Sequence, residues 1–182
     1  MKHRHFNLLL FFAIAAFTLT SCFGGVTYSI DNPTDQAIEV SIDGRDAITI
    51  APMELKRMDG TLKEGEHTMT LKDGEEIKFI LDKDQVMLNP TLSTYVTALE
   101  EYSVGGGMQS SKNDTILVID GKEYEGPFPA VSNYPFIYSG NLNYHVDKPF
   151  KAEITTSKSG TVTMRKLFRK DEFIKYYKEE YM

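Results

Sequence analysis

The sequence predicts a mainly β protein, with one or two small antiparallel β-sandwich units and a short C-terminal amphipathic helix. Three observations lead to this fold class. From Val26 onward, apolar and polar residues alternate, which is the period of a half-buried strand. Asp-Gly pairs separate the alternating runs, and this dipeptide favours hairpins because a type I′ turn requires positive φ at both central residues. Near the C-terminus, aromatic residues recur every four positions, which is close to the period of a helix.

Residues 26–84 are expected to form a first β-sandwich module, because short alternating runs joined by turns are typical of sandwiches. The runs are Val26/Tyr28/Ile30, Ile38/Val40/Ile42, Ile48/Ile50, Met69/Leu71 and Ile77/Phe79/Leu81. The turns expected between them are Asp43-Gly44, Asp59-Gly60 and Asp73-Gly74. This rhythm of hairpins resembles the small PEGA or transthyretin-like modules of envelope lipoproteins.

Residues 85–182 are expected to form a second β-rich module that ends in a helix, and the pattern is compatible with one domain as well as with two. Its predicted strands are 94–104, 115–120, 136–138, 142–146, 152–156 and 161–168. In the last segment, Phe173, Tyr177 and Tyr181 share one helical face, and Asp171 is the predicted N-cap. We expect this aromatic face to cover the protein's own sheet.

The first 21 residues have the pattern of a secretory signal peptide. Lys2 and Arg4 form a basic start, and residues 8–17 form an apolar run. This run is too short to cross a bilayer, which requires about 20 apolar residues. A basic start followed by an apolar core of this length is instead typical of an export signal.

The signal ends in Leu19-Thr20-Ser21-Cys22, which resembles the lipobox of bacterial lipoproteins. The resemblance implies that residues 1–21 are removed, that the Cys22 thiol receives a diacylglycerol, and that the new amine is acylated. Residues 22–25 then form a short tether. One acyl chain binds membranes only reversibly, so several chains on one residue make the anchor stable. Cys22 is the only cysteine, and lipidation explains an unpaired thiol in an exported protein.

The residue after the anchor indicates where the protein is delivered. In Gram-negative lipoproteins, aspartate at this position marks retention in the inner membrane. Phe23 therefore implies the outer membrane, with the body facing the periplasm. In a Gram-positive cell, the same chain would lie on the outer face of the only membrane.

The charge of the chain disfavours nucleic acid as a partner. The 182 residues include 20 basic and 26 acidic ones, for a formal net charge of −6. Cleavage of the signal removes Lys2 and Arg4 and makes the body more acidic still. An acidic body repels a phosphate backbone. The expected partners are the bilayer, through acylated Cys22, and an envelope protein.

The sequence carries no recognisable catalytic or metal-binding pattern. Outside the signal, the histidines are His67 and His145, and each is expected to lie in a strand with its ring packed. No serine occurs in a G-x-S-x-G motif, and neither histidine has the spacing of a zinc site. We therefore assign no catalytic, cofactor-binding or metal-binding residue, and we predict that the protein is not an enzyme.

An aromatic segment, residues 126–146, gives the one candidate ligand site. Rings near asparagine and proline are typical of a sugar or peptide groove, although the same rings can form a core. The candidate groove residues are Tyr134, Phe136, Tyr138, Tyr144 and His145. The leading hypothesis for function is a non-catalytic envelope lipoprotein that acts through protein contact. The alternatives are a carbohydrate- or peptide-binding lipoprotein that uses the aromatic residues in 128–144, and a hydrolase that uses a histidine beside a carboxylate.

Overall fold

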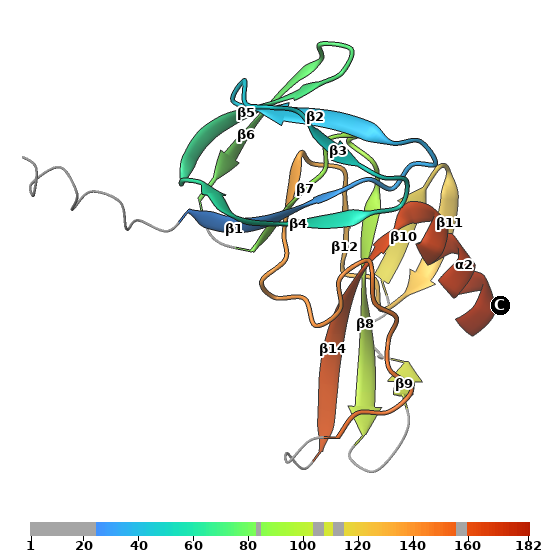
Figure 1. The fold of residues 1–182 in the computed structure, drawn as a ribbon. Helices are drawn as coiled ribbons and strands as arrows, with labels where there is room; N and C mark the ends of the chain where they lie inside the picture. Colours follow the sequence, from blue (N-terminus) through green and yellow to red (C-terminus); the bar gives the residue numbers. More distant parts are fainter. Residues whose placement is uncertain (1–24, 83–84, 104–107, 111–114, 156–159) are drawn as a thin grey trace, which may run out of the picture.

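The computed structural model describes residues 25–82, 85–103, 108–110, 115–155 and 160–182 (Figure 1). The predicted signal peptide and the lipidation site Cys22 lie outside these residues. Within them the protein is mainly β, with antiparallel sheets and a C-terminal helix, which confirms the predicted fold class. The elements are β1 Val26–Asp31, β2 Ile38–Ile42, β3 Ile48–Ile50, β4 Leu55–Leu62, β5 Gly65–Leu71, β6 Glu76–Leu81, β7 Val86–Leu88, β8 Tyr95–Ser103, β9 Met108–Ser110, β10 Thr115–Ile119, β11 Lys122–Gly126, β12 Ala130–Ser132, β13 Phe136–Tyr138, β14 Thr161–Arg169 and α2 Lys170–Glu180.

Two four-stranded sheets form a β-sandwich. One has the strand order β13-β7-β1-β4, and the other has the order β3-β2-β5-β6. The alternation along each strand places one set of apolar side chains between the sheets, as the period-2 pattern predicts. The core of the sandwich is built from Val26, Tyr28, Ile30, Val40, Ile42, Ile50, Leu62, Met69, Ile77, Phe79, Leu81, Val86 and Leu88.

The first of these sheets takes strands from both sides of the predicted module boundary at residue 84. β7 runs parallel to β1, with Tyr28 opposite Val86, and β13 pairs with β7. The backbone N–H of Gln85 donates to the Thr27 carbonyl at 2.8 Å, which brings the chain alongside β1 at the start of β7. The two segments of the chain therefore share one sheet.

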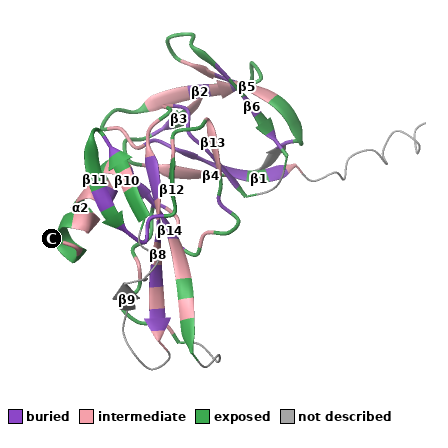
Figure 2. Cartoon of the chain, turned by 180° about the vertical axis from the view of Figure 1, so that it is seen from behind, coloured by how far each residue is buried: buried purple, intermediate pink, exposed green. Residues whose placement is uncertain are grey.

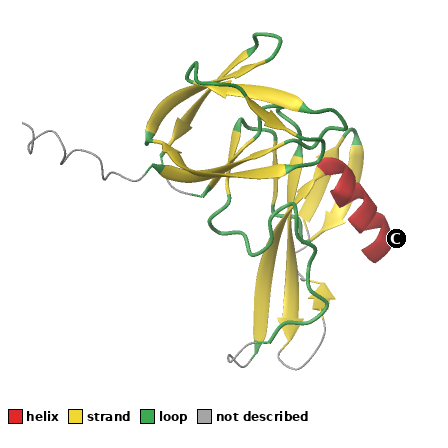
Figure 3. Ribbon diagram, viewed as in Figure 1, coloured by secondary structure: helices red, strands yellow, loops and turns green. Residues whose placement is uncertain are grey.

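A third sheet, in the order β12-β8-β14 with β9 beside β8, packs by one end against the sandwich, and β8 and β14 extend away from it (Figure 3). β8 and β14 pair over nine residues. One face of this pair contributes Tyr95 and Leu167 to a small apolar layer with Met87 and Val146, against the sandwich. The other face contributes Val96 and Phe168 to a core that it shares with α2 and the β10–β11 hairpin.

A buried ion pair crosses the boundary between the sandwich and the third sheet. Arg169 at the end of β14 donates to Asp31 at the end of β1, from Nη2 at 2.7 Å and from Nε at 3.0 Å. Tyr95 donates its hydroxyl to the same carboxylate at 2.6 Å. Asp31 is fully buried, and burial and the Asp31 charge raise the pKa of Tyr95. The three side chains join β1, β8 and β14.

Several local predictions are wrong, each for a physical reason. Asp59-Gly60 lies inside β4, opposite a register shift between β1 and β4, so the dipeptide belongs to a β-bulge. α2 begins at Lys170 with Arg169 as its N-cap, because Arg169 is still extended and paired with Tyr95 as the last residue of β14. Asp171 is therefore in the first turn, where its charge favours the helix N-terminus.

Two predicted strands in the second segment are also absent among the described residues. Residues 142–146 make one bridge, between Tyr144 and Lys166, and 152–155 form no strand. The Asn143 side chain accepts from the Arg165 N–H at 2.8 Å. The segment therefore follows the edge of β14 as a loop.

Candidate interaction surface

The β10–β11 hairpin is a regular two-stranded unit closed by a two-residue turn. Asp120 and Gly121 have φ values of 51° and 75°, both positive as a type I′ turn requires. Such a turn suits the right-handed twist of the strands that it joins. The pairing runs from Ile119 opposite Lys122 to Thr115 opposite Gly126. The Asp-Gly signal at this position therefore predicts the turn correctly.

The inner face of the hairpin packs against α2. Leu117, Ile119 and Tyr124 belong to the core shared with the helix. The Tyr124 ring lies 5.4 Å from that of Phe173 and 5.0 Å from that of Tyr177, in edge-on arrangements. α2 thus holds the hairpin in place, as expected for an aromatic helix face that covers its own sheet.

The outer face of β10 leaves two β-branched side chains in solvent. Ile116 and Val118 are each 63% exposed, and Glu123 and Glu125 stand exposed opposite them on β11. Figure 2 shows the exposed residues along both strands. These two neighbouring side chains form a small exposed apolar patch on one strand, which is available for contact.

The backbone of β10 also has an unpaired edge within the described part of the chain, where β11 is its only partner. In a two-residue hairpin, the residues that flank the turn exchange hydrogen bonds, and alternate residues point away. The N–H and C=O groups of Ile116 and Val118 therefore point away from β11. The same alternation directs the Glu125 N–H outward from β11, where it donates to the Tyr177 hydroxyl at 3.4 Å.

Several other sheet edges in the described residues carry the usual protection against pairing. Soluble proteins keep edge strands short or charged. β3, β9, β12 and β13 have three residues each, and β6 presents Glu76 and Lys78 beside the exposed Ile80. β10 has five residues and no charge. We call Ile116, Val118 and the outward backbone groups of β10 the β10 edge.

The β10 edge lies far from the start of β1. Figures 1 and 2 place the beginning of β1 at one end of the sandwich and the hairpin with α2 at the other. A body tethered just before β1 would therefore direct this surface away from its anchor.

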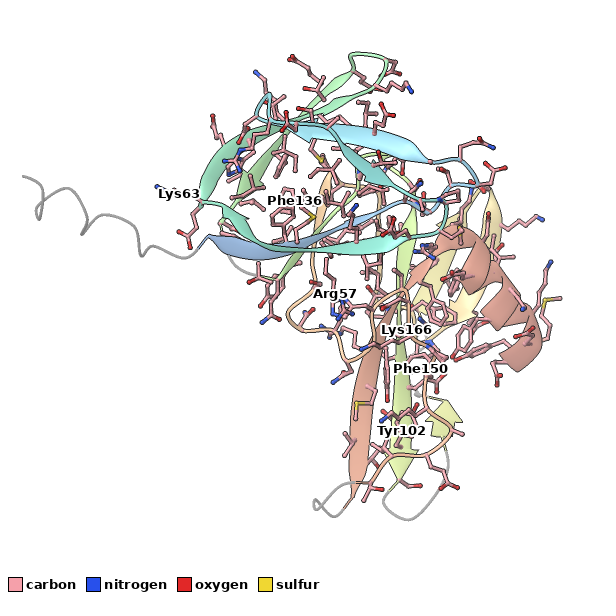
Figure 4. The ribbon with its side chains drawn as sticks, viewed as in Figure 1. Arg57, Lys63, Tyr102, Phe136, Phe150 and Lys166 are labelled. Atoms are coloured by element: carbon pink, nitrogen blue, oxygen red, sulfur yellow. The ribbon has the colours of Figure 1, made fainter. Side chains whose placement is uncertain are left out.

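A cavity of about 530 Å³ lies between α2, β14 and residues 146–152. Phe150 and Lys166 both line it (Figure 4). Lys166 donates from Nζ to the carbonyls of His145 at 3.2 Å and Lys148 at 2.6 Å, and Nζ lies 4.4 Å from the Phe168 ring centroid. Burial lowers its pKa to about 8. Because these contacts engage the amine, it fastens the loop to β14 rather than facing a ligand.

Glu100 is a second buried ionisable side chain beside α2. It lies on the same face of the third sheet as Lys166. It is 2% exposed, and the Tyr176 hydroxyl donates to its Oε1. Burial raises the pKa of Glu100, and the charge of Glu180 raises it further, whereas the hydrogen bond from Tyr176 lowers it. The net effect is a pKa of Glu100 above its ordinary value, so folding makes the protonated form more favourable than it is in the unfolded chain.

This arrangement predicts a pH-dependent effect of Glu100→Gln. A raised pKa in the folded state contributes stability that is lost as the pH rises above the unfolded value of 4.5. Glutamine retains an acceptor for Tyr176 and never carries the buried charge. We expect the variant to be more stable than the wild type at pH 8, on the order of 1 kcal/mol, and this difference to shrink toward pH 5. Urea unfolding at both values measures it, and an equal difference at both would contradict the account.

The candidate groove residues do not meet in one groove. Phe136 points into the sandwich core (Figure 4), and Tyr144 is buried with its ring 5.5 Å from that of Phe150. Tyr134 and Tyr138 are 69% and 40% exposed on different turns of the chain. His145 lines a separate cavity of about 360 Å³ with Arg57 and Ser139. Its Nδ1 is buried and has no hydrogen-bond partner among the described residues, and burial lowers the pKa of the ring.

His67 lies in β5 with its ring packed, as its alternation with Met69 predicts. Its Nδ1 lies 2.7 Å from Asp43 Oδ2, its Nε2 lies 2.8 Å from the Lys63 carbonyl, and its ring packs 5.5 Å from that of Phe79. Because both nitrogens already have oxygen partners, neither faces a nucleophile, as a hydrolase would require.

The β10 edge was not among the residues that the sequence singles out. The sequence feature that could have identified the β10 edge is the run Thr115-Ile116-Leu117-Val118-Ile119, in which both faces of a hairpin strand are apolar. Among the described residues, no group of histidine, cysteine, aspartate or glutamate is arranged to hold a metal ion. In the same part of the chain, no helix has the length and apolarity needed to cross a membrane.

Comparison of the chain with protein-family models, curated proteins and solved structures found no match.

Proposed function

We propose that the protein is a non-catalytic bacterial envelope lipoprotein that is anchored through Cys22 and acts by contact with another protein molecule. The observation that carries the proposal is the β10 edge, an uncharged five-residue edge strand with two side chains 63% exposed. Exposed strand edges of this kind are templates for pairing with another chain.

The position of the surface supports the proposal. The tether between Cys22 and Val26 spans at most about 14 Å, because an extended residue covers about 3.5 Å. It would hold the start of β1 close to the lipid head groups, while the β10 edge lies at the other end of the molecule (Figure 1). Phe23 supports delivery to the outer membrane of a Gram-negative cell, where the contact surface would face the periplasm.

The arrangement of the aromatic segment favours protein contact over carbohydrate or peptide binding. Of the five candidate groove residues, Phe136 and Tyr144 belong to the packed interior, and the exposed Tyr134 and Tyr138 do not share a cavity with His145. A sugar site needs several rings on one open face.

Site-specific crosslinking in intact cells tests the contact. A photoreactive residue at position 116 or 118 is expected to give a discrete crosslinked product that mass spectrometry identifies. The matched control is position 80 on β6, because Ile80 is 53% exposed but lies beside charged residues. Products of equal yield from positions 80, 116 and 118, or no protein product from 116 and 118, would contradict the proposal.

The anchor is tested separately. Cys22→Ala is expected to abolish incorporation of labelled fatty acid and to move the protein from the membrane fraction to the soluble fraction, because the acyl chains supply the membrane affinity. Retention of the label by this variant would contradict Cys22 as the lipid attachment site. If the contact also requires the anchor, the crosslinked product disappears with it.

A further inference from the structure

We propose that the β10 edge pairs with the β10 edge of a second copy of the same chain, so that two hairpins form one four-stranded antiparallel sheet across a two-fold axis. This inference rests on the proposed function and names the partner of the first contact. Three observations support it. The outward backbone groups of the β10 edge have a self-complementary spacing, the edge carries no charge, and the opposite edge of the hairpin, on β11, is charged and partly covered.

The spacing of the outward groups is self-complementary. Ile116 and Val118 direct their N–H and C=O groups away from β11 and lie symmetrically about Leu117. A two-fold axis at Leu117 places Ile116 of one copy opposite Val118 of the other. Each such pair exchanges two hydrogen bonds, as in any hydrogen-bonded pair of an antiparallel ladder. The two symmetric pairs satisfy all four outward groups of each edge without a shift of register.

The side chains of the edge favour this pairing. The strand carries no charge, so no like charges meet when it pairs with itself. On the outer face, the β-branched side chains of Ile116 and Val118 become cross-strand neighbours, an arrangement that stabilises sheets. Glu123 and Glu125 stay on the outermost strands of the combined sheet, two strand spacings from the nearest β10 of the other copy, about 10 Å.

The assembly closes at two copies. The opposite edge of the hairpin belongs to β11, which carries Lys122, Glu123 and Glu125, and Tyr177 of α2 bonds the Glu125 N–H. That edge is charged and partly covered, so it does not accept a further strand. A two-fold contact between identical edges uses both β10 strands and leaves no growing end.

The membrane favours the pairing. Four inter-strand hydrogen bonds and a few side-chain contacts form a small interface, and small interfaces are weak in solution. Two bodies held by lipid on one surface meet at a much higher effective concentration than free ones. We therefore expect association to be weak for the anchor-less chain in solution and pronounced for the lipidated chain.

Disulfide crosslinking between two single-cysteine variants tests the register. Each is made in the full chain with Cys22→Ala, so that the introduced thiol is the only one, and the oxidation is carried out at high protein concentration because the chain without its anchor associates weakly. Ile116→Cys mixed with Val118→Cys is expected to form the mixed disulfide several-fold faster than either variant forms a disulfide alone. The paired positions lie about 5.5 Å apart between Cα atoms, within the range that a disulfide spans, whereas the diagonal 116–116 separation of about 7–8 Å exceeds it. Equal rates for the three combinations, or no disulfide, would overturn the inference.

Edge variants test the pairing in the lipidated protein reconstituted in vesicles. Val118→Lys acts on both copies at once, so we expect the dimer fraction, measured by energy transfer between labelled copies, to fall about tenfold. Ile80→Lys, with a similarly exposed side chain on β6, is expected to leave it unchanged. Equal circular dichroism spectra confirm that both variants are folded. A dimer fraction insensitive to Val118→Lys would overturn the inference.

The two proposals fail in different ways in the cellular crosslinking experiment. A product at positions 116 and 118 that contains another protein but not a second copy overturns self-pairing and keeps the proposed function. The absence of any protein product from these positions overturns both.

Discussion

Replacing Arg169 with methionine is expected to lower the free energy of unfolding by about 3–5 kcal/mol. Asp31 is fully buried and receives two hydrogen bonds from this guanidinium. Methionine fills much of the volume but leaves the carboxylate with the Tyr95 hydroxyl as its remaining side-chain donor among the described residues. An unpaired buried charge is far more costly than the loss of a surface pair. Chemical denaturation followed by circular dichroism measures the change.

Two further variants show whether the loss comes from the buried charge. Arg57→Met removes an exposed ion pair with Asp147 at 3.3 Å and should cost less than about 1 kcal/mol. In the double variant Asp31→Leu with Arg169→Met, the fully buried carboxylate is gone as well, and the Glu172 carboxylate that also pairs with Arg169 is one-third exposed to solvent. The loss in this variant should therefore be smaller than that of Arg169→Met alone. Similar losses of unfolding free energy for Arg57→Met and Arg169→Met would contradict this account of the buried ion pair.

Phe173→Ala is expected to cost about 3–5 kcal/mol and to release α2 from the third sheet. The ring is fully buried, with its centroid 4.8 Å from that of Phe128 and 5.4 Å from that of Tyr124. Truncation leaves a cavity at the centre of the core shared by the helix, the hairpin and the sheet. Near-UV circular dichroism and limited proteolysis of the C-terminus measure the release.

Lys175→Ala is the matched control on the same helix. Its side chain is exposed, and its contact with Glu179 at 3.9 Å is a surface pair worth less than about 0.5 kcal/mol. Because α2 supports the hairpin, Phe173→Ala should also weaken crosslinking through position 118, whereas Lys175→Ala should not. Loss of stability with an unchanged protease pattern would show that the helix stays docked without this ring.

Local patterns in the sequence predict many of the strands and the helix. The alternation of Val26, Tyr28 and Ile30 identifies β1 because those side chains do face the sandwich core. The Asp120-Gly121 pair identifies the turn between β10 and β11 for a similar local reason, since both residues adopt positive φ. These features depend on residues that are neighbours along the chain.

The remaining features depend on contacts between distant segments. Arg169 and Asp31 are separated by 138 positions, and no local pattern connects them. In the aromatic segment, alternation separates Phe136 from Ile137, but it does not reveal that one ring enters the sandwich and that its neighbour joins the next apolar layer. At β10, all five residues lack charge, so period-2 reasoning cannot assign the exposed face.

The parallel pairing of β7 with β1 has a consequence for the order in which the protein can fold during synthesis. A chain that emerges from the ribosome N-terminus first delivers β1 to β6 early, yet the sheet that contains β1 also needs β7 and β13, and β13 ends at Tyr138. Until then, the sandwich has an open flank beside β1. Contacts between segments so distant in sequence form slowly, so the nascent body must remain incomplete until about three quarters of the chain has emerged.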